Sequence, residues 1–438
     1  MEWVKAMTTP REKYERRLET FTGYVEDGEI DEETAEAIRE LVRAYDDHNV
    51  MISCPPGEST RTPGTLMSWV YRLAQFARDR DLTEATLSDL KADMQSMHDG
   101  SHPHVGDDGI TKGTLRSYQA ALRKFYRYHD FGVDPDEIPI HSKSASPVDP
   151  NDMLTREEIN EAQEAATNAR DRALFDLLLY TGQRREAIRT LRLKDVDVQE
   201  GTYRLNPNVD GLKGAQDRNG KRPLLGAKGA LQNWLDYHPD TADPENYLIT
   251  GRPSYSAVDP STPVSGETIR RVMADIKEET DIEKPMHPHA LRHNFVTIAK
   301  RDHNLPDDTI KYLIGHDESS QVMETTYSHL SGDDHVKRAE EGWGIREPDD
   351  ESPLSPDVCG VCGNPLQPNA KACSRCGTIY TPDARGAMDQ MEEKIGEEKE
   401  QAETLEEYKD ADAIAQALED DPKLAAELMD KLGNLSDE

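Results

Sequence analysis

Apolar residues in the first third of the chain recur at the three- and four-residue spacing of amphipathic helices. The clearest runs are Glu33 to Tyr45 and Leu66 to Arg78, and a third extends from about Thr114 to His129. Thr9-Pro10-Arg11-Glu12 is a capping box with proline at the first helical position, a strong signal for a helix start. The pattern predicts a helical first domain over residues 1–135.

A proline-rich stretch without helical periodicity follows, and it predicts a linker over residues 136–152. It ends at a second capping box, Thr155 to Glu158. Residues 153–345 then combine helical patterns with two short β-type runs, 202–205 and 221–225, on either side of a Gly- and Asn-rich loop. We therefore expect a second domain that is helical with a small antiparallel sheet, in a protein that is mainly α.

The C-terminal part divides again by composition. Residues 346–357 read as a second linker, 358–380 as a cysteine-rich module and 384–438 as an acidic helical tail. Near the end, Asp421-Pro422 opens a short amphipathic helix that Gly433 closes. This helix is either a contact for another subunit or partner, or a solvated helix with no partner.

The charge changes the expected environment. The 438 residues hold 52 Lys and Arg against 86 Asp and Glu, a formal net charge of −34, with only 6 Phe. The acidic excess is spread over all segments, and it resembles the proteins of extreme halophiles, so we expect a haloarchaeal-type protein. A disordered acidic chain fits the periodic helices poorly. Taken alone, the charge argues against electrostatic binding of nucleic acid.

Membrane and export signals are not evident. The longest apolar stretch, Ala173 to Tyr180, contains Asp176 and is too short to span a bilayer. The N-terminus lacks the apolar region of a signal peptide, and five cysteines in so long a chain do not suggest a disulfide framework. We expect a cytoplasmic protein that does not contact membranes.

Three groups of phosphate-binding residue types lie in the second domain. Arg184 follows Thr181-Gly-Gln in a turn after an apolar helix, where its planar guanidinium can bind a phosphate with two hydrogen bonds. His289 and Arg292 share a face if they lie on a helix. His316 follows a glycine, and Tyr327 comes eleven residues later.

The order and spacing of these groups resemble the tyrosine recombinase (phage integrase) family, in particular its XerC- and XerD-like site-specific recombinases. TGQR, HALRHNF, LIGH and TTYSHL are similar to the family's TGxR, HxLRHTF, LGH and terminal tyrosine blocks. The resemblance covers about residues 10–340. It implies a SAM-like helical core-binding domain before the catalytic domain. It also implies a homo-oligomer, a tetramer, on a specific site in double-stranded DNA.

The implied reaction cuts and rejoins DNA strands through a covalent 3′-phosphotyrosine, with no metal or nucleotide cofactor for catalysis. Two guanidiniums would neutralise charge on the non-bridging oxygens, a phenol would attack, and a hairpin lysine would protonate the 5′-oxygen. Lys213 matches that lysine, and Lys221 is the alternative. The implied catalytic set is Arg184, Lys213, His289, Arg292, His316 and Tyr327.

The chain departs from the family at Ala187, where an acidic residue is usual; Glu186 lies one position early. A catalytically inactive DNA-binding relative is therefore the main alternative. A metal site in the histidine-rich run 287–293 is disfavoured, because no carboxylate accompanies it at ligand spacing and both arginines would go unexplained.

Two CxxC pairs, each followed by glycine, predict a closed tetrahedral zinc site that resembles a zinc ribbon. A redox pair is the weaker alternative, and a zinc-ribbon interaction factor is a third class of function. Cys54 reads as an ordinary thiol. The proposed ligands are Cys359, Cys362, Cys373 and Cys376.

One helix of the first domain is unusually basic for so acidic a chain. It is either a solvated face or a phosphate-contacting face, and in the second case it would join Lys221, Arg222 and the catalytic cations in a basic lining within an acidic shell. The candidate DNA-binding residues on it are Arg116, Arg123, Lys124 and Arg127.

Overall fold

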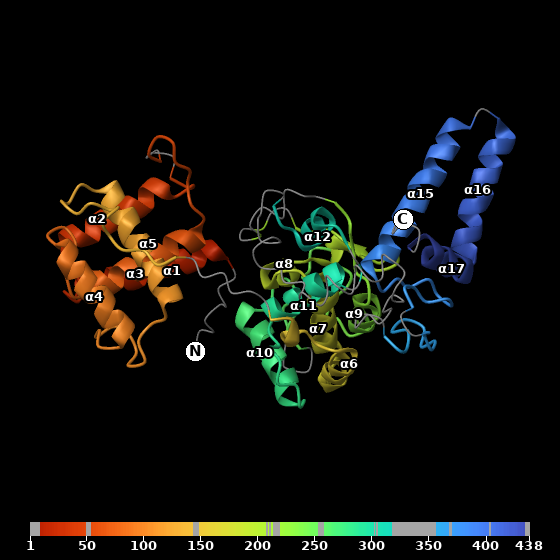
Figure 1. Ribbon diagram of the computed structural model, residues 1–438, viewed down its shortest axis with the longest axis horizontal. Coiled ribbons are helices and arrows are strands. Elements are labelled where there is room, and N and C mark those ends of the chain that lie inside the picture. Colours follow the sequence, from red (N-terminus) through yellow and green to blue (C-terminus); the bar gives the residue numbers. More distant parts are fainter. Residues whose placement is uncertain are drawn as a thin grey trace, which may run out of the picture. The chain divides into compact units, whose positions relative to one another are not determined.

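The computed structural model describes residues 9–49, 54–142, 149–206, 220–252, 258–301, 305–317, 356–367, 370–402 and 404–433, with Val209, Leu212 and His303. The chain divides into two compact units, residues 1–145 and 146–438 (Figure 1). The cysteine module and the tail belong to the second of these units. None of the described helices is both long and apolar enough to cross a membrane.

The first unit is helical. Its helices α2, α3 and α5 correspond to the three periodic runs, and Thr9 and Glu12 form the expected capping box at the start of α1. The periodicity did not identify α4. Apolar faces of all five helices meet in one core. The helices are α1 (Pro10–Glu26), α2 (Glu32–Tyr45), α3 (Pro63–Ala77), α4 (Leu87–Asp99) and α5 (Lys112–Tyr128).

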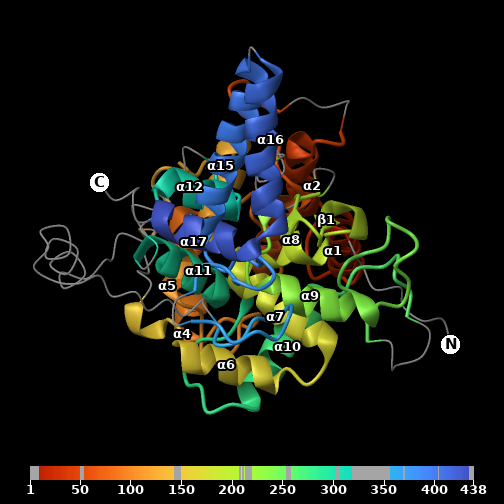
Figure 2. The same cartoon turned by 90° about the vertical axis from the view of Figure 1, so that its right-hand side faces the viewer.

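The second unit is built around α7, which is buried along nearly its whole length and packs against α9 and α11 (Figure 2). Thr155 and Glu158 form the expected capping box at the start of α6. The helices of this part are η1 (Pro150–Asp152), α6 (Arg156–Ala165), α7 (Ala169–Thr181), α8 (Arg185–Arg189), η2 (Leu193–Asp195), α9 (Ala227–Asp236), α10 (Gly266–Glu278), α11 (Pro288–Arg301) and α12 (Asp307–Ile314).

A small antiparallel sheet of order β1-β2-β3 lies beside these helices. Its strands are β1 (Val196–Asp197), β2 (Thr202–Tyr203) and β3 (Arg222–Pro223). In this register Tyr203 lies opposite Val196 on one side and Arg222 on the other. The two predicted strands are present but shorter than the sequence suggested, and β1 was not foreseen. The mainly helical fold with a small sheet is thus confirmed.

Three helices form the C-terminal tail: α15 (Pro382–Gln401), α16 (Leu405–Asp420) and α17 (Pro422–Gly433). The first two lie side by side, and α17 packs against both (Figures 1 and 2). The tail was expected to be helical, but its composition did not locate the break at which a new helix starts, at a capping box of Thr404 and Glu407. The expected start of the last helix at Pro422 is confirmed.

Candidate active site

Arg184, Arg292 and His316, from three of the sequence motifs, meet at the C-terminal end of α12. Helices leave their last carbonyl groups without partners inside the helix. In α12, the carbonyls of four successive residues, 312 to 315, instead accept hydrogen bonds from side chains of other elements. The pairs are Arg222 Nε to Tyr312 O (3.2 Å), Gln183 Nε2 to Leu313 O (2.6 Å), Arg292 Nη1 to Ile314 O (2.8 Å) and Arg184 Nη1 to Gly315 O (3.1 Å).

Local geometry aims these donors at the helix end. Helix α7 ends at Thr181, and Gly182 adopts a left-handed conformation (φ 58°), which reverses the chain so that Arg184 becomes the N-cap of α8. Arg292 projects inward from α11 and is 1% exposed. Its Nη1 also donates to the carbonyl of Gly182 at 2.8 Å. One guanidinium therefore joins the ends of α7 and α12.

His316 lies next to both arginines. Burial lowers its pKa to about 3, and the positive charges of Arg292 and Arg184 contribute to that shift. The imidazole is therefore neutral at ordinary pH, with one nitrogen able to donate and the other able to accept. Its Nδ1 is buried and has no hydrogen-bond partner within the described part of the chain.

His289 is on the first turn of α11, three residues before Arg292, and it is exposed. Its ring lies 4.2 Å from that of His293, measured between centroids. Burial lowers the pKa of His293 to about 4, with the charges of His289 and Arg292 adding to the effect. The structure thus brings Arg184, Arg292 and His316 together and places His289 on the helix that carries Arg292.

Of the two lysines considered as proton donors, only Lys221 lies within the described residues. Lys213 lies outside the described residues, as does Tyr327. Lys221 is half-exposed, and its Nζ lies 2.5 Å from a carboxylate oxygen of Glu200. Its neighbour Arg222, expected in a basic lining, is instead 1% exposed and bonds to α12, because the strand turns it inward. That expectation for Arg222 is wrong.

The structure shows the surroundings of Ala187, the position at which the family usually has an acidic residue, and of its neighbour Glu186. Ala187 is buried in the core of the second unit. Glu186, one position early, pairs with Arg189 at 2.7 Å and lies 3.6 Å from Arg185. Its carboxylate therefore supports α8, the helix that Arg184 caps.

The four cysteines of the C-terminal module form a compact cluster. Their sulfur atoms all lie within 4.8 Å of one another. Sulfur pairs 359–376 and 362–373 are each 3.6 Å apart. In each knuckle the glycine after the second cysteine has a positive φ and donates its N–H to the carbonyl of the first cysteine at 2.8 Å. The two CxxC turns therefore have the same backbone geometry, and their four sulfur atoms converge on one point.

This module packs on helices α6 and α9 of the second unit. Asp357 lies 3.5 Å from Arg156 and accepts a hydrogen bond from Asn160, both on α6. On α9, Gly229 approaches Gly360 so closely that a Cβ on Gly229 would lie 2.4 Å from the Gly360 carbonyl oxygen. The cysteine module thus contacts α9 through backbone atoms and α6 through side chains.

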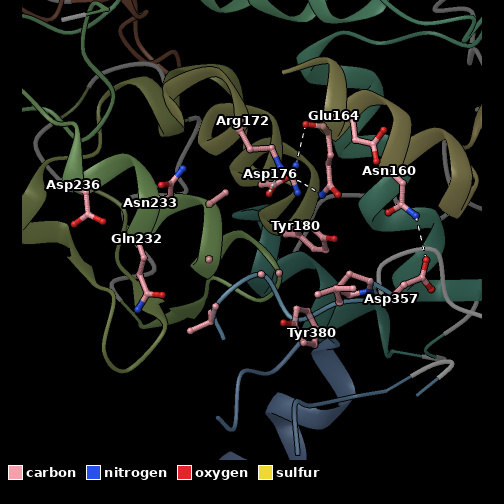
Figure 3. Close-up of a pocket in the computed structure, with 18 residues that line it drawn as sticks. Asn160, Glu164, Arg172, Asp176, Tyr180, Gln232, Asn233, Asp236, Asp357 and Tyr380 are labelled. Carbon is pink, nitrogen blue, oxygen red and sulfur yellow. Dashed lines mark hydrogen bonds and ion pairs between the residues drawn. The ribbon is translucent and has the colours of Figure 1, made fainter. Parts of the chain in front are cut away.

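A pocket of about 820 Å³ lies at this junction, between α6, α7, α9 and the module (Figure 3). Asp176 at its edge is buried, which raises the pKa of its carboxyl, while Arg172 and Gln163 hydrogen-bond to it. Tyr380 lines the same pocket and donates its hydroxyl to the sulfur of Cys359 at 3.0 Å.

The basic helix expected to contact DNA is α5, and several of its cations have partners inside the first unit. Arg123 donates to the carbonyls of Asp136 and Ile138. Lys124 pairs with Glu58 and lies 4.1 Å from the centre of the Tyr45 ring. These two side chains hold the chain around α5, and contact with DNA remains a prediction for them.

The other two cations of α5 differ in exposure. Arg127 is exposed and pairs with Asp136 at 2.5 Å. Arg116 is half-buried. For both of them as well, contact with DNA stays a prediction.

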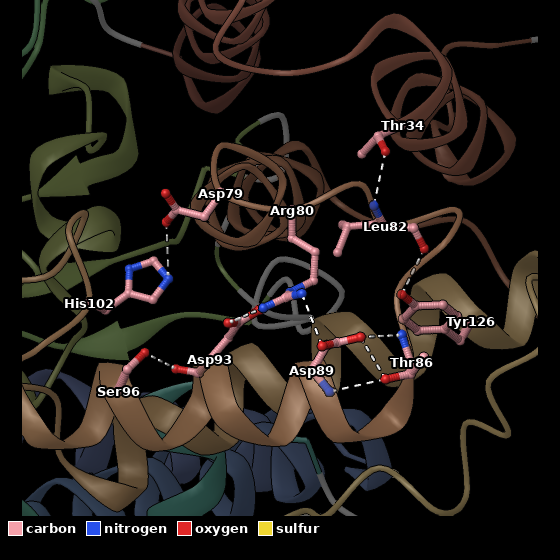
Figure 4. A network of polar contacts seen from close by, with 10 residues as sticks. All are labelled: Thr34, Asp79, Arg80, Leu82, Thr86, Asp89, Asp93, Ser96, His102 and Tyr126. Carbon is pink, nitrogen blue, oxygen red and sulfur yellow. Dashed lines mark hydrogen bonds and ion pairs between the residues drawn. The ribbon is translucent and has the colours of Figure 1, made fainter.

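A hydrogen bond from Tyr126 also connects helix α5 to the turn that follows α3. Tyr126 donates its hydroxyl to the Leu82 carbonyl at 2.8 Å, and the Leu82 N–H donates to Thr34 of α2 at 3.0 Å (Figure 4). Next to this turn, Arg80 binds both carboxylate oxygens of Asp93 on α4. The turn after α3 therefore joins α2, α4 and α5.

The sequence analysis did not identify two side chains that donate to carbonyls at the end of α12. These are Gln183 and Arg222. Gln183 stood inside a recognised motif, between Gly182 and Arg184, but at its variable position. Arg222 was assigned to the surface by its charge. No local signal marked the carbonyls of α12 as the common acceptor.

Residues 152–333 match the phage integrase family. The XerC tyrosine recombinase of Vibrio parahaemolyticus is 24% identical over 302 residues, covering 62% of this chain and 91% of the relative. The XerA tyrosine recombinase of Saccharolobus solfataricus is 24% identical over 261 residues, covering 58% and 78%. Among solved structures, XerH recombinase bound to a palindromic difH substrate is similar, with 17% identity, a TM-score of 0.45 and coverage of 78% and 98%. Residues 152–333, which include Arg184, Arg292 and His316 at the end of α12, thus form a phage integrase family domain, and the chain is similar to the tyrosine recombinases.

Proposed function

We propose that this protein is a site-specific DNA recombinase or integrase that cuts and rejoins strands through a covalent 3′-phosphotyrosine. The observation that carries the proposal is the meeting of two guanidiniums, Arg184 and Arg292, with the neutral imidazole of His316 at the end of α12. Two fixed cations and one neutral donor suit the charge that develops on the non-bridging oxygens of a phosphodiester.

In the proposed reaction the phenolic oxygen of Tyr327 attacks the phosphorus, and the bond from phosphorus to the 5′-oxygen breaks. The energy of the phosphodiester is kept in the new phosphotyrosine bond, so that a second 5′-hydroxyl can reverse the step. Lys213 would donate a proton to the departing 5′-oxygen, and Lys221 is the alternative donor. His289 would help to move the proton of the phenol or orient the phosphate.

The arginines need little rearrangement to do this. Arg292 is held by two carbonyls at 2.8 Å before any phosphate arrives, so its guanidinium is already oriented. Donors that are fixed in advance stabilise a transition state without a reorganisation cost at the moment of reaction. The chemistry requires no metal ion at this site.

The partner we propose is double-stranded DNA carrying a specific recombination site, bound by a homo-oligomer that is a tetramer when two duplexes are joined. Strand exchange between duplexes requires a nucleophile for every strand cut, which one chain does not supply. Arg116, Arg123, Lys124 and Arg127 on α5 are the proposed backbone contacts of the first unit.

For the cysteine module we propose a structural zinc ribbon. Tetrahedral zinc with bonds of about 2.3 Å to sulfur separates its ligands by roughly 3.8 Å, and the sulfur pairs at 3.6 Å fit that geometry. Cys359, Cys362, Cys373 and Cys376 would hold the ion. It would supply folding energy for the two knuckles and take no part in strand cleavage.

The net charge of −34 supports a further proposal, that the protein works at high salt as a halophilic protein. At molar ionic strength the screening length is about 3 Å, so the acidic surface no longer repels DNA at a distance. The cations at the end of α12 would still act by direct hydrogen bonds.

The test is capture of the covalent adduct. The full chain is incubated in KCl with sheared genomic DNA of its source organism, stopped in detergent, and the protein-linked DNA is recovered and sequenced. We expect adducts at a recurrent site, lost in Tyr327→Phe and kept in the control Tyr237→Phe, whose side chain is exposed on the surface. If DNA is bound at one site without any adduct, the chain is the inactive DNA-binding relative.

A further inference from the structure

Gln183 is a buried amide that uses both of its N–H groups. It is 1% exposed, and its Nε2 donates to the hydroxyl oxygen of Tyr203 at 2.9 Å and to the carbonyl of Leu313 at 2.6 Å. The Leu313 carbonyl can only accept, so the orientation of the amide is determined by its partner. One side chain thus connects the turn before α8, strand β2 and the end of α12.

Its neighbours in sequence are the groups that would contact phosphate. Arg184 follows Gln183 directly, and the carbonyls that hold Arg292 and Arg184 belong to the two residues after Leu313. A shift of the Leu313 carbonyl away from Gln183 would therefore move the acceptors of both arginines. An apolar side chain of similar volume could fill the same space, but it could not donate the two hydrogen bonds that Gln183 makes.

We propose that Gln183 is a positioning residue for strand cleavage: it fixes the end of α12 relative to the arginine turn and the sheet, and so sets the separation of Arg184 and Arg292. This inference rests on the proposed recombinase function. Gln183 itself is not expected to touch the DNA, because it is enclosed by Tyr203 and α12.

Tyr203 supports the arrangement from the sheet. Its ring is fully buried, which raises the pKa of the phenol to about 12, while the charge of Arg222 and the hydrogen bond from Gln183 act in the opposite direction. The phenol is neutral, and its oxygen can accept from the amide. The Tyr203 contact attaches Gln183 to β2, whereas the Leu313 contact attaches it to α12.

The test compares Gln183→Met with the parent in the full-length protein. Methionine has similar length but no N–H group, so the carbonyl of Leu313 loses its donor while the volume is kept. Gln232→Met on α9 is the matched control, and Tyr203→Phe removes the hydroxyl through which Gln183 contacts the sheet while leaving the Leu313 contact in place.

The first measurement needs no catalysis. Hydrogen exchange of the backbone amides of Gly315 and His316 is followed without DNA, and Gln183→Met should accelerate it about tenfold, the effect of losing roughly one hydrogen bond. The control and Tyr203→Phe should leave it near the parent value. Unchanged exchange in Gln183→Met overturns the proposal whether or not the chain is a recombinase.

The second measurement is the single-turnover rate of adduct formation on the captured site. Gln183→Met should slow it by about tenfold or more at saturating DNA, because misplaced catalytic groups lose rate rather than affinity. DNA affinity should stay near that of the parent. An equal loss of affinity and rate, or a normal rate, contradicts a positioning role, whereas absence of an adduct in the parent contradicts the proposed function itself.

Discussion

The Nη1 atom of Arg292 lies 2.8 Å from the carbonyl oxygen of Ile314, the last residue of α12. The carbonyl end of a helix carries a partial negative charge, so the guanidinium is stabilised there before a phosphate is present. The same nitrogen reaches Gly182 at 2.8 Å. Arg292 is therefore both a structural connection between α7 and α12 and the proposed contact to the scissile phosphate.

Replacing Arg292 by lysine should remove more than a phosphate contact. Lysine keeps the charge but lacks the planar fork that serves two carbonyls and a phosphate together. We expect adduct formation to fall by about 100-fold or more, the usual cost of losing one fixed donor to a developing oxyanion. The rate is measured in single turnover on the captured DNA site.

The matched control for this change is Arg270→Lys on α10, where the guanidinium is exposed and pairs with Glu267. It should leave the rate at the parent value. A parent-like rate in Arg292→Lys would show that the guanidinium geometry is not needed for cleavage.

Local signals in the sequence were enough for much of the fold. The capping boxes at Thr9 and Thr155 involve residues three apart, and the turn at Gly182 needs only a residue that tolerates positive φ. The site itself depends on contacts between distant residues. The bond from Gln183 to Leu313 joins positions 130 apart, and no periodicity encodes it.

The sequence also could not predict whether the side chain of Arg222 points inward or outward. Arg222 is a cation on a strand only two residues long, too short for alternation to reveal its inward face. The break between α15 and α16 was not predicted, because the whole segment is acidic and favours helix. Thr404 and Glu407 nevertheless carry the sequence signal of a capping box. Motif order identified the family, while the donors that hold the end of α12 required the structure.

Gly182→Ala tests the turn that presents the arginines. The residue has φ 58°, and an added Cβ would lie 2.5 Å from Phe295 Cδ1. We expect the free energy of unfolding to fall by roughly 1–2 kcal/mol from the left-handed backbone and about 1–3 kcal/mol more from overpacking. Gly132→Ala is the control, since its φ is also positive but an added Cβ would meet no atom within 4 Å. Equal losses for the two variants, measured by denaturant unfolding, would argue against the Phe295 contact.

The buried His316 should make the DNA-free protein sensitive to acid. Its pKa is lowered to about 3 from an ordinary 6.5, so below pH 6.5 the unfolded chain binds a proton that the folded site resists. The free energy of unfolding should therefore fall as pH decreases from about 6.5 towards 3.

His316→Asn should make this decline shallower, while His293, with a pKa of about 4, keeps part of it. His48→Asn, at an exposed position, serves as the control. Denaturant unfolding at several pH values gives the slopes. An unaltered slope in His316→Asn would mean that the imidazole does not resist protonation in the folded protein.

Metal removal should affect the cysteine module and leave the chemistry intact. We expect one zinc ion per chain in the parent, and its loss in Cys373→Ser, with faster proteolysis of residues 358–380 because the knuckles depend on metal to fold. Cys54→Ser is the control, since Cys54 lies in the first unit. Adduct formation should persist after chelation; its complete loss would assign zinc a role in cleavage.

The acidic surface leads to an expectation for DNA affinity. A protein that binds through many phosphate contacts loses affinity steeply with salt, with a slope of about −0.9 per contact on a plot of log K against log salt. Here the net charge is −34, and the proposed contacts at the end of α12 act at short range by hydrogen bonds. The affinity for the captured site, measured by fluorescence anisotropy as KCl rises through the molar range, should decline with a much shallower slope. Arg127→Gln, which removes an exposed cation of α5, should weaken binding by a factor that becomes smaller as KCl rises. A steep loss of binding between low and high KCl would contradict the halophilic proposal and leave the recombinase proposal standing, because the adduct experiment does not depend on the slope.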